Sequence, residues 1–246
     1  MTFKFSVITI TKDNPEEFSY TADSLINQKY KNFEWIVIDK SLKKESFEML
    51  DKYKKYIDIL KTGIDNGIAN AWNHGIKLSS GDYIFILNSG DIYPQNFLMD
   101  YFLNISESKY IYFSTVKIQE KSKDKYFYNR GRPGLLGIGM FVPHMTICLS
   151  RFFHEKYGLY PELKFSMDFA LFHKIFKEEG PKIFKEIKTR EKPIFNLGGL
   201  SDVFYKESLK TNMEIIQSNG GSKLKVILLF YYFIFKNFIF NIMRNF

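Results

Sequence analysis

The chain has 246 residues, enough for one large α/β domain with an appendage, and 45% of them are hydrophobic, so a sizeable core can form. A net charge of +8 favours anionic partners, but no RNA-binding or helix-turn-helix signature accompanies the scattered lysines, and we expect no nucleic-acid partner. The single cysteine, Cys148, excludes an intrachain disulfide and a cysteine-rich zinc site. The N-terminus shows no signal peptide, which predicts a cytoplasmic protein.

Strands and helices are predicted to alternate in the first part of the chain. In chain order they are a strand at 5–10, a helix opened by Asn14 and Pro15, a strand at 33–39, a helix at 43–54, a strand at 56–60, a helix at 68–78, a strand ending at Asn88 and a helix opened by Pro94. Asn14 is the predicted N-cap, and Pro15 suits the first helical position. This order is typical of an α/β fold with a Rossmann-like, mostly parallel sheet that is flanked by helices.

The pattern changes after about residue 105, which divides a predicted domain at 1–220 into halves at 1–105 and 106–220. The second half is predicted to contain strands at 110–118 and 125–128 as an antiparallel pair, a glycine-rich loop at 131–139, a helix at 168–177, a strand at 183–187 and a helix at 202–219. We expect this half to form a smaller subregion beside the main sheet.

The tail at 221–246 differs from the rest of the chain. Its uninterrupted apolar run, Val226–Phe235, is shorter than the roughly 20 residues that a spanning helix needs. On a helical wheel, Lys223, Asn237 and Asn241 share one face with the last polar residues. An amphipathic helix at a membrane surface fits this pattern, and the alternative is a helix docked on the domain or on a second subunit.

Three acids follow strand-like segments: Asp39, Asp65 and Asp91. A carboxylate at the tip of a buried strand is costly without a partner, and a divalent cation with a phosphate is a common partner. Because the carboxyl ends of parallel strands share one edge, the three acids can converge on one ligand. Each acid alone could instead cap the following helix. Asn73 and the other asparagines after Asp65 suit the hydroxyls and ring amides of a nucleoside.

Five segments resemble, in order, motifs of the family 2 glycosyltransferases, and the resemblance extends over nearly all of residues 3–205. The segments are Ser6–Thr11, Ser24–Tyr30, Trp35–Asp39, Asp65–Gly75 and Asn88–Asp91. The fourth resembles the D-x-G-x-x-x-A-x-N-x-G pattern of the family, and the fifth stands where its metal-binding D-x-D motif belongs. The resemblance implies the GT-A fold and an enzyme of the bacterial capsule, lipopolysaccharide or colanic-acid type.

The resemblance also implies roles for single residues on the donor side. Asp91 is expected to ligate Mg²⁺ or Mn²⁺ at the diphosphate of a nucleotide sugar, most simply a UDP-sugar. The residues expected to hold the donor are Thr9, Asp39, Asp65, Asn73 and Ser89. The metal would act as a Lewis acid on the leaving nucleoside diphosphate.

On the acceptor side, segments around Pro143, Lys156 and Asp168 resemble the second half of the same enzymes. In that pattern Asp168 is the general base, which implies single displacement with inversion at the anomeric carbon. The alternative for Asp168 is an N-cap of the helix that starts there, and both roles are compatible. His144 is expected to contact the diphosphate or the acceptor, although a single histidine is often only structural.

Two departures from the family pattern leave an alternative open. Lys40–Lys43 follow Asp39 where the family has Gly, Ser, Thr and another acid, and Gly90 replaces the middle acid of the metal motif. The expected function is transfer of a hexose or N-acetylhexosamine to a glycan or lipid-linked acceptor, close to the inner face of the membrane. The alternative is a degenerate transferase fold that serves as a non-catalytic, membrane-associated assembly subunit.

Overall fold

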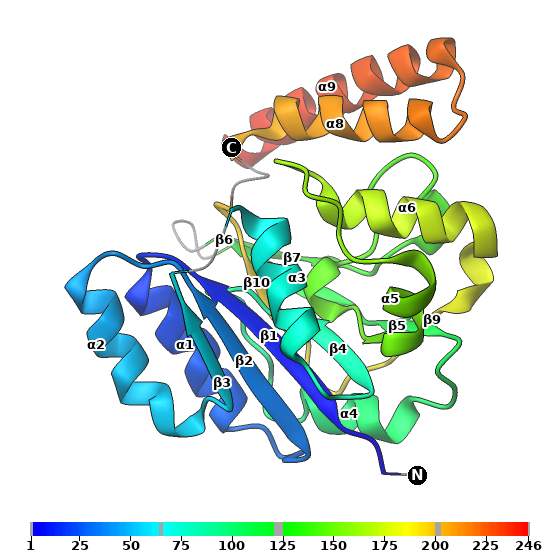
Figure 1. Cartoon of the computed structure of the whole chain (residues 1–246). Coiled ribbons are helices and arrows are strands. Elements are labelled where there is room, and N and C mark those ends of the chain that lie inside the picture. Colours follow the sequence, from blue (N-terminus) through cyan, green and yellow to red (C-terminus); the bar gives the residue numbers. More distant parts are fainter. Residues whose placement is uncertain (1, 64–65, 121–124, 200–202, 246) are drawn as a thin grey trace.

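Alternating strands and helices build the first half of the protein, in a computed structural model that describes residues 2–63, 66–120, 125–199 and 203–245 (Figure 1). In chain order they are β1 (Phe5–Thr11), α1 (Pro15–Ile26), β2 (Phe33–Asp39), α2 (Lys44–Tyr53), β3 (Ile59–Thr62), α3 (Ile68–Leu78), β4 (Tyr83–Ile86) and α4 (Phe97–Asn104). This order agrees with the prediction. β3 begins at Ile59 rather than at residue 56, because residues 54–56 form a 3-10 turn.

The central sheet has the strand order β3-β2-β1-β4-β8, and its first four strands are mutually parallel, as predicted. β8 (Leu149–Ser150) adds an antiparallel edge to β4. Both faces of the sheet are covered: Ile8 and Ile36 pack with α3, α5 (Arg151–Tyr157) and α6 (Met167–Glu179), whereas Val7 and Trp35 pack with α1, α2 and α4. Burial on both faces explains why these strands are continuous apolar runs in the sequence.

Two smaller sheets form beside the central one. The other strands and α-helices are β5 (Ile111–Phe113), β6 (Val116–Glu120), β7 (Lys125–Asn129), β9 (Phe184–Glu186), β10 (Ile194–Asn196), α8 (Tyr205–Ser218) and α9 (Lys223–Asn245). One sheet has the order β10-β6-β7, and its β6 and β7 form the predicted antiparallel pair. In the other sheet β5 pairs in parallel with β9, which confirms the strand predicted at 183–187.

The prediction of one strand at 110–118 is wrong, because the chain breaks there into β5 and β6, which belong to different sheets. The backbone of Ser114, between the two strands, is bound by a side chain instead of a neighbouring strand. Its N–H donates to Thr146 Oγ1 (3.2 Å), and its carbonyl accepts from the same hydroxyl (3.1 Å). A threonine from a distant segment thus takes the hydrogen bonds that would have continued the ladder.

The C-terminal helices α8 and α9 form a hairpin that packs above α6 (Figure 1). Val226 and Phe233 of α9 are buried against Leu209 and Met213 of α8. The Tyr205 hydroxyl of α8 also donates a hydrogen bond to the backbone of α9, at Phe233 O (3.2 Å). One face of the tail therefore docks on the domain, which was the alternative considered for it.

The exposed side of α9 is apolar rather than polar. Leu224, Leu228, Tyr231 and Phe235 recur at helical spacing and are each more than 60% exposed. Asn237 is only partly exposed, while the side chain of Asn241 lies outside the described part of the chain. In the described residues, no helix has the length and hydrophobicity required to span a bilayer. The tail is thus a helix with two apolar faces, of which only one is covered by the protein.

A buried carboxylate joins β1, β2 and the turn before β4. Glu34 accepts hydrogen bonds from Lys4 Nζ (2.8 Å), Ser6 Oγ (2.5 Å), the Ser80 hydroxyl (2.8 Å) and the Gly81 N–H (3.1 Å). Its side chain is only 6% exposed. Burial alone would raise its pKa, but these donors outweigh burial and lower the pKa of Glu34 to about 2.

Glu34→Gln is expected to lower the free energy of unfolding at pH 7 by about 2–3 kcal/mol, because the amide cannot accept from all these donors. The pKa of Glu34 is lower in the folded state, so its contribution is complete above the unfolded value and is lost as pH falls from about 4.5 towards about 2. Urea unfolding between pH 7 and pH 2.5 measures both effects. The exposed Glu45→Gln is the matched control, and a pH dependence equal to that of the wild type in Glu34→Gln would contradict the assignment.

Candidate active site

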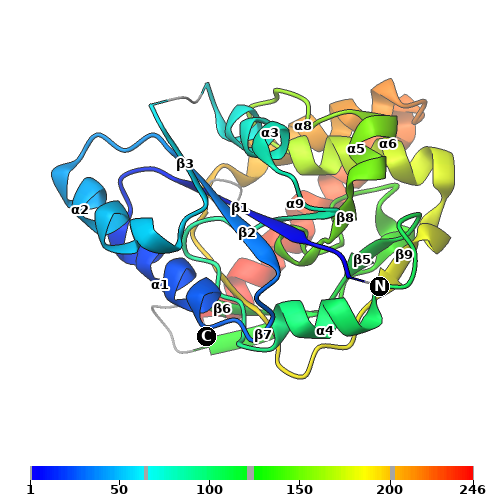
Figure 2. The same cartoon turned by 60° about the horizontal axis from the view of Figure 1, so that its bottom comes forward.

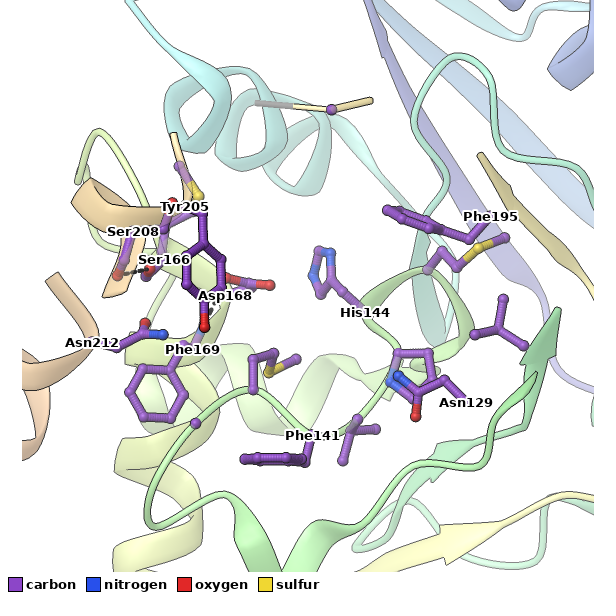
Figure 3. A pocket seen from close by; sticks show the side chains of 18 of the residues that line it. Asn129, Phe141, His144, Ser166, Asp168, Phe169, Phe195, Tyr205, Ser208 and Asn212 are labelled. Carbon is purple, nitrogen blue, oxygen red and sulfur yellow. Dashed lines mark hydrogen bonds between the residues drawn. The ribbon is translucent and has the colours of Figure 1, made fainter. Parts of the chain in front are cut away.

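A cavity of about 530 Å³ lies where the carboxyl end of the central sheet meets the second half of the chain (Figure 3). Its walls come from the start of α3, the turn after β4, the sheet β10-β6-β7, the segment 138–145, the N-terminus of α6 and the face of α8. Three of the predicted site residues line it: Asp91, His144 and Asp168. Segments distant in the sequence therefore supply their ionisable side chains to one space.

Asp91 lies in the turn after β4 and is 6% exposed. Burial and the nearby negative charge of Glu17 raise the pKa of Asp91 well above its usual range. None of the described residues hydrogen-bonds to its carboxylate, while its backbone carbonyl accepts from the Thr21 hydroxyl (2.8 Å). A buried acid in this state favours a proton or a cation as its partner.

The sequence pattern did not reveal that Glu17 lies near this site. Asn14 is the residue before α1, as predicted, but its side chain does not cap the helix; its Nδ2 donates to Glu17 Oε2 (3.1 Å). The Glu17 carboxyl lies next to Gly90: a Cβ on Gly90 would be 3.6 Å from the carboxyl carbon. A carboxylate thus comes from α1 to the place where the metal motif lacks its middle acid.

His144 belongs to an aromatic cluster in the cavity. Its ring centroid is 4.7 Å from that of Trp72, and its Nε2 forms a hydrogen bond of 3.0 Å with the Tyr160 hydroxyl. The Trp72 indole in turn donates to Asn88 Oδ1 (3.0 Å), which fixes the side chain that precedes the acidic turn. Burial lowers the pKa of His144, with Asp168 acting in the opposite direction, so the neutral imidazole is favoured at pH 7.

Asp168 is the second residue of α6 and is partly buried. Its Oδ1 accepts the N–H of Phe169 (2.8 Å), so the acid also satisfies one of the free amides of the helix end. Ser166, just before the helix, adopts a left-handed conformation with φ 59°, and its hydroxyl donates to Ser208 O on α8 (3.1 Å). The N-cap residue is Ser166 rather than Asp168, so the alternative interpretation holds only in that Asp168 lies in the first turn of α6, and Asp168 also faces the cavity (Figure 3).

Asp39 and Ser89 lie outside the cavity wall, and each has a buried oxygen with no hydrogen-bond partner among the described residues. Asp39 ends β2 and is fully buried; its Oδ1 accepts from the Ser41 N–H (3.0 Å), while Oδ2 is unpaired. In the turn after β4, the buried Ser89 Oγ likewise has no hydrogen-bond partner among the described residues. Asp65 lies outside the described residues.

The atypical segment after Asp39 is held by a second acid, which the sequence pattern did not single out. Asp13 adopts φ 52°, and its Oδ1 accepts from the Leu42 N–H (2.8 Å) and the Lys43 N–H (2.9 Å). These backbone donors lower the pKa of Asp13. The loops after β1 and β2 are thereby tied together beside Asp39.

Two predicted donor residues have hydrogen-bond partners inside the protein. Thr9 is fully buried, and its hydroxyl accepts from the Trp35 indole (3.0 Å). Asn73 is 6% exposed and holds both backbone polar groups of Tyr160, donating to its carbonyl (2.7 Å) and accepting from its N–H (2.9 Å). Neither side chain lines the cavity: Thr9 lies in the core and Asn73 attaches the Tyr160 loop, so the structure does not place their predicted donor contacts at this cavity.

The profile of the family described as Glycosyl transferase family 2 matches residues 6–170. The UDP-Glc:alpha-D-GlcNAc-diphosphoundecaprenol beta-1,3-glucosyltransferase WfaP of Escherichia coli is 24% identical, with 92% of this chain and 91% of that protein covered. The poly(ribitol-phosphate) beta-N-acetylglucosaminyltransferase TarP of Staphylococcus aureus is 32% identical, with 39% of this chain and only 31% of that protein covered.

Solved structures show the same fold. S. aureus TarS in complex with UDP-GlcNAc has a TM-score of 0.65 at 16% identity, with 94% of this chain and 71% of that chain covered. The mannosyltransferase PcManGT from Pyrobaculum calidifontis, in complex with GDP-Man and Mn²⁺, has a TM-score of 0.65 at 13% identity, with 94% and 69% covered. These likenesses confirm the predicted α/β architecture with a mostly parallel central sheet.

Proposed function

Because the chain belongs to glycosyltransferase family 2, we propose that it is an inverting, metal-dependent enzyme that moves a hexose or an N-acetylhexosamine from a UDP-sugar to a glycan or lipid-linked acceptor. The observation that supports this most is the single cavity that contains both Asp91 and Asp168. We assign Asp91 to the donor diphosphate and Asp168 to the acceptor. A donor and an acceptor that meet in this cavity gain the effective concentration that transfer requires.

We place Mg²⁺ or Mn²⁺ at Asp91. Its carboxylate is buried, no described residue bonds to it, and Glu17 adds negative charge beside it, so the oxygen ligands suit a hard divalent cation. Among the described residues, the atoms nearest to a Cβ on Gly90 are those of the Glu17 side chain, so Glu17 could replace the acid missing there. When bound, the cation would neutralise the charge of the leaving diphosphate.

For the nucleoside, we propose contacts with Asp39 and Ser89. The unpaired Oδ2 of Asp39 needs a hydrogen-bond donor, and a ring N–H or a ribose hydroxyl supplies one. We propose UDP as the nucleotide of the donor, since WfaP is named for UDP-Glc and TarS was solved with UDP-GlcNAc. Thr9 and Asn73 are left out of the donor contacts, since their polar groups already have partners inside the protein.

In the proposed reaction, Asp168 removes the proton of an acceptor hydroxyl while that oxygen attacks the anomeric carbon. The bond from this carbon to the diphosphate oxygen breaks, its electron pair leaves with UDP, and the proton stays on Asp168. One displacement inverts the anomeric centre. Neutral His144, held by Tyr160 and Trp72, offers a ring nitrogen to the diphosphate or to the acceptor without adding a charge.

The acceptor proposed from the relatives is a sugar on a lipid diphosphate, in the assembly of capsule, lipopolysaccharide or another surface polysaccharide. WfaP, which this chain matches over most of both lengths, is named for such an acceptor. The exposed apolar face of α9 is consistent with work at a membrane surface. Lys223, Lys225 and Lys236 on the same helix are exposed, and α9 contains no acid, which suits anionic lipid on the cytoplasmic side.

Replacing the four exposed residues of that face with serine is expected to lower binding to anionic vesicles about tenfold or more, because their apolar area no longer enters the interface. The variant carries Leu224→Ser, Leu228→Ser, Tyr231→Ser and Phe235→Ser, and flotation with phosphatidylglycerol vesicles measures the bound fraction. Its buried face keeps the hairpin docked. The control carries Leu42→Ser and Leu103→Ser, two exposed apolar residues elsewhere, and an equal loss of binding in both variants would contradict the proposal.

The function itself is tested by incubating the protein with a panel of nucleotide sugars and Mn²⁺ and measuring slow release of the nucleoside diphosphate. The expected result is release from a UDP-sugar that stops when the metal is chelated. This assay needs no acceptor. If no nucleotide binds in calorimetry, with or without Mn²⁺, the alternative of a non-catalytic assembly subunit is favoured instead.

A further inference from the structure

One face of α8 forms a wall of the cavity near Asp168. Tyr205, Ser208 and Asn212 are spaced as i, i+3 and i+7, so they share a side of the helix, and all three line the cavity. Figure 3 shows them together with Ser166 and Asp168 on one side, with His144 across from them. The matched family segment ends at residue 170, before α8 begins, so these side chains belong to a part of the chain for which the family match gives no role.

Two polar atoms on this face are buried without a partner. Ser208 Oγ and Asn212 Oδ1 have no hydrogen bond to any described residue, and Ser208 is 8% exposed. Their neighbours are satisfied: Tyr205 donates to Phe233 O, and Ser166 donates to Ser208 O. A buried polar atom left unpaired costs stability, and two of them facing one cavity next to a candidate base indicate a ligand that pairs with them.

We infer that α8 carries an acceptor-recognition face, on which Ser208 and Asn212 bind hydroxyl groups of the acceptor sugar while Asp168 takes the proton of the attacking hydroxyl. This inference rests on the proposed function and names the residues that select its acceptor. It assigns them a positioning role; the proton transfer remains with Asp168.

The chemistry of the wall defines the ligand. Asn212 Oδ1 and the Asp168 carboxylate can only accept hydrogen bonds, and Ser208 Oγ can accept as well. A ligand that pairs with both unpaired oxygens presents O–H donors close together, as neighbouring hydroxyls of a sugar do. A phosphate is disfavoured here because Asp168 repels it and it offers no donor to Asn212 Oδ1, whereas a sugar hydroxyl can donate to Oδ1 and also accept from Asn212 Nδ2. For an acceptor with a diphosphate, the sugar and not the diphosphate belongs on this wall.

The rest of this end of the cavity fits a sugar ring too. Phe141, Phe169 and Phe233 line it beside the polar atoms of α8. Aromatic surface next to hydrogen-bonding groups suits a saccharide, which has apolar C–H faces and a polar rim. In Figure 3 Phe141 and Phe169 lie below Asp168, so the ring would be bounded by aromatic side chains on one side and by α8 on another.

The test uses Ser208→Ala, Asn212→Leu and their combination in the full chain. Because these changes remove unpaired buried atoms, we expect a Tm no lower than that of the wild type. Thr211→Ala is the matched control: it removes a hydroxyl from the same helix that is bonded to Glu207 O and does not line the cavity. A lower Tm in both single variants would show that the two side chains have structural partners, and it would overturn the inference.

Activity gives the second readout, with α-GlcNAc-diphosphate on a long alkyl chain and free N-acetylglucosamine and glucose as acceptor probes. In the double variant we expect acceptor-dependent transfer to fall about tenfold or more through KM, with hydrolysis of the UDP-sugar unchanged. Transfer that is unchanged in the double variant overturns the inference and leaves the proposed function standing. Absence of nucleotide binding or hydrolysis in the wild type removes the proposed function, and this inference with it.

Discussion

Asp168→Asn is expected to lower turnover by about 10²–10⁴-fold while leaving the affinity for UDP unchanged, because it removes the proposed base and nothing on the donor side. The amide keeps an oxygen for the Phe169 N–H, so the first turn of α6 should stay intact. Loss of the negative charge at the helix N-terminus costs about 0.3–1 kcal/mol of stability at most. Steady-state transfer rates and a UDP titration, each in Mn²⁺, measure the two quantities separately.

The matched control for this variant is Glu178→Gln, an exposed acid on the same helix away from the cavity. It should retain wild-type rates. Transfer at the normal rate in Asp168→Asn would remove Asp168 from the mechanism. A parallel loss of UDP binding and turnover would place this residue on the donor side, contrary to the assignment made here.

Asp91→Asn is expected to abolish the part of UDP affinity that depends on Mn²⁺ and to lower turnover by about 10²-fold or more, because the carboxylate is the proposed protein ligand of the metal. The same change should not destabilise the fold. A buried acid whose pKa is raised by burial and by Glu17 is unfavourable when ionised, so a neutral amide is expected to leave the Tm equal or higher.

Calorimetry of UDP with Mn²⁺ and with EDTA, together with thermal unfolding, separates these effects. Asp51→Asn, an exposed acid on α2, is the control and should leave both unchanged. Glu17→Gln should also lower the Mn²⁺-dependent UDP affinity and the turnover, but by less than Asp91→Asn does, since Glu17 only adds negative charge beside the proposed metal ligand. Metal-dependent binding that survives in Asp91→Asn, or a large fall in its Tm, would identify Asp91 as a structural acid instead.

The alternative of a non-catalytic assembly subunit can be compared with the enzyme through the buried polar groups at the end of the sheet. A protein that only kept the fold would have no need for a destabilised acid at Asp91 or for unpaired atoms at Asp39 and Ser89. Such groups lower stability, and selection for stability alone tends to remove them. Their presence around the end of the sheet therefore supports the enzyme over the assembly subunit.

Local patterns in the sequence were sufficient for much of the fold. The strand containing Val7 and Ile8 is apolar on both faces, which indicates a sheet covered on both sides, and the alternation with helices gave the parallel order. Asp91 was singled out because it follows a buried strand-like segment, and Asp168 because the segment around it resembles the second half of the family 2 enzymes. A residue in a short motif keeps its position relative to its own strand or helix, regardless of the rest of the fold.

Side-chain partners from distant segments could not be found in this way. Thr9 and Asn73 stand at the expected places in β1 and α3, but their polar groups are taken by Trp35 and Tyr160, which are 26 and 87 residues away. The break at Ser114 likewise depends on Thr146. A polar side chain can bind a ligand or another part of the protein, depending on which atoms pack against it in the folded state. The hydrophobic periodicity of the sequence does not show which of these occurs.

The alternation of strands and helices, the mostly parallel sheet and the helix that bears Asp168 follow from apolar periodicity and turn residues alone, because these act over a few neighbouring positions. Only the packed molecule brings Glu17 beside Gly90 and sets α8 against the cavity, with Ser208 and Asn212 unpaired. It also decides that α9 covers one of its apolar faces and exposes the other. Those relations arise from contacts between residues far apart in the chain, which form only when the whole core closes.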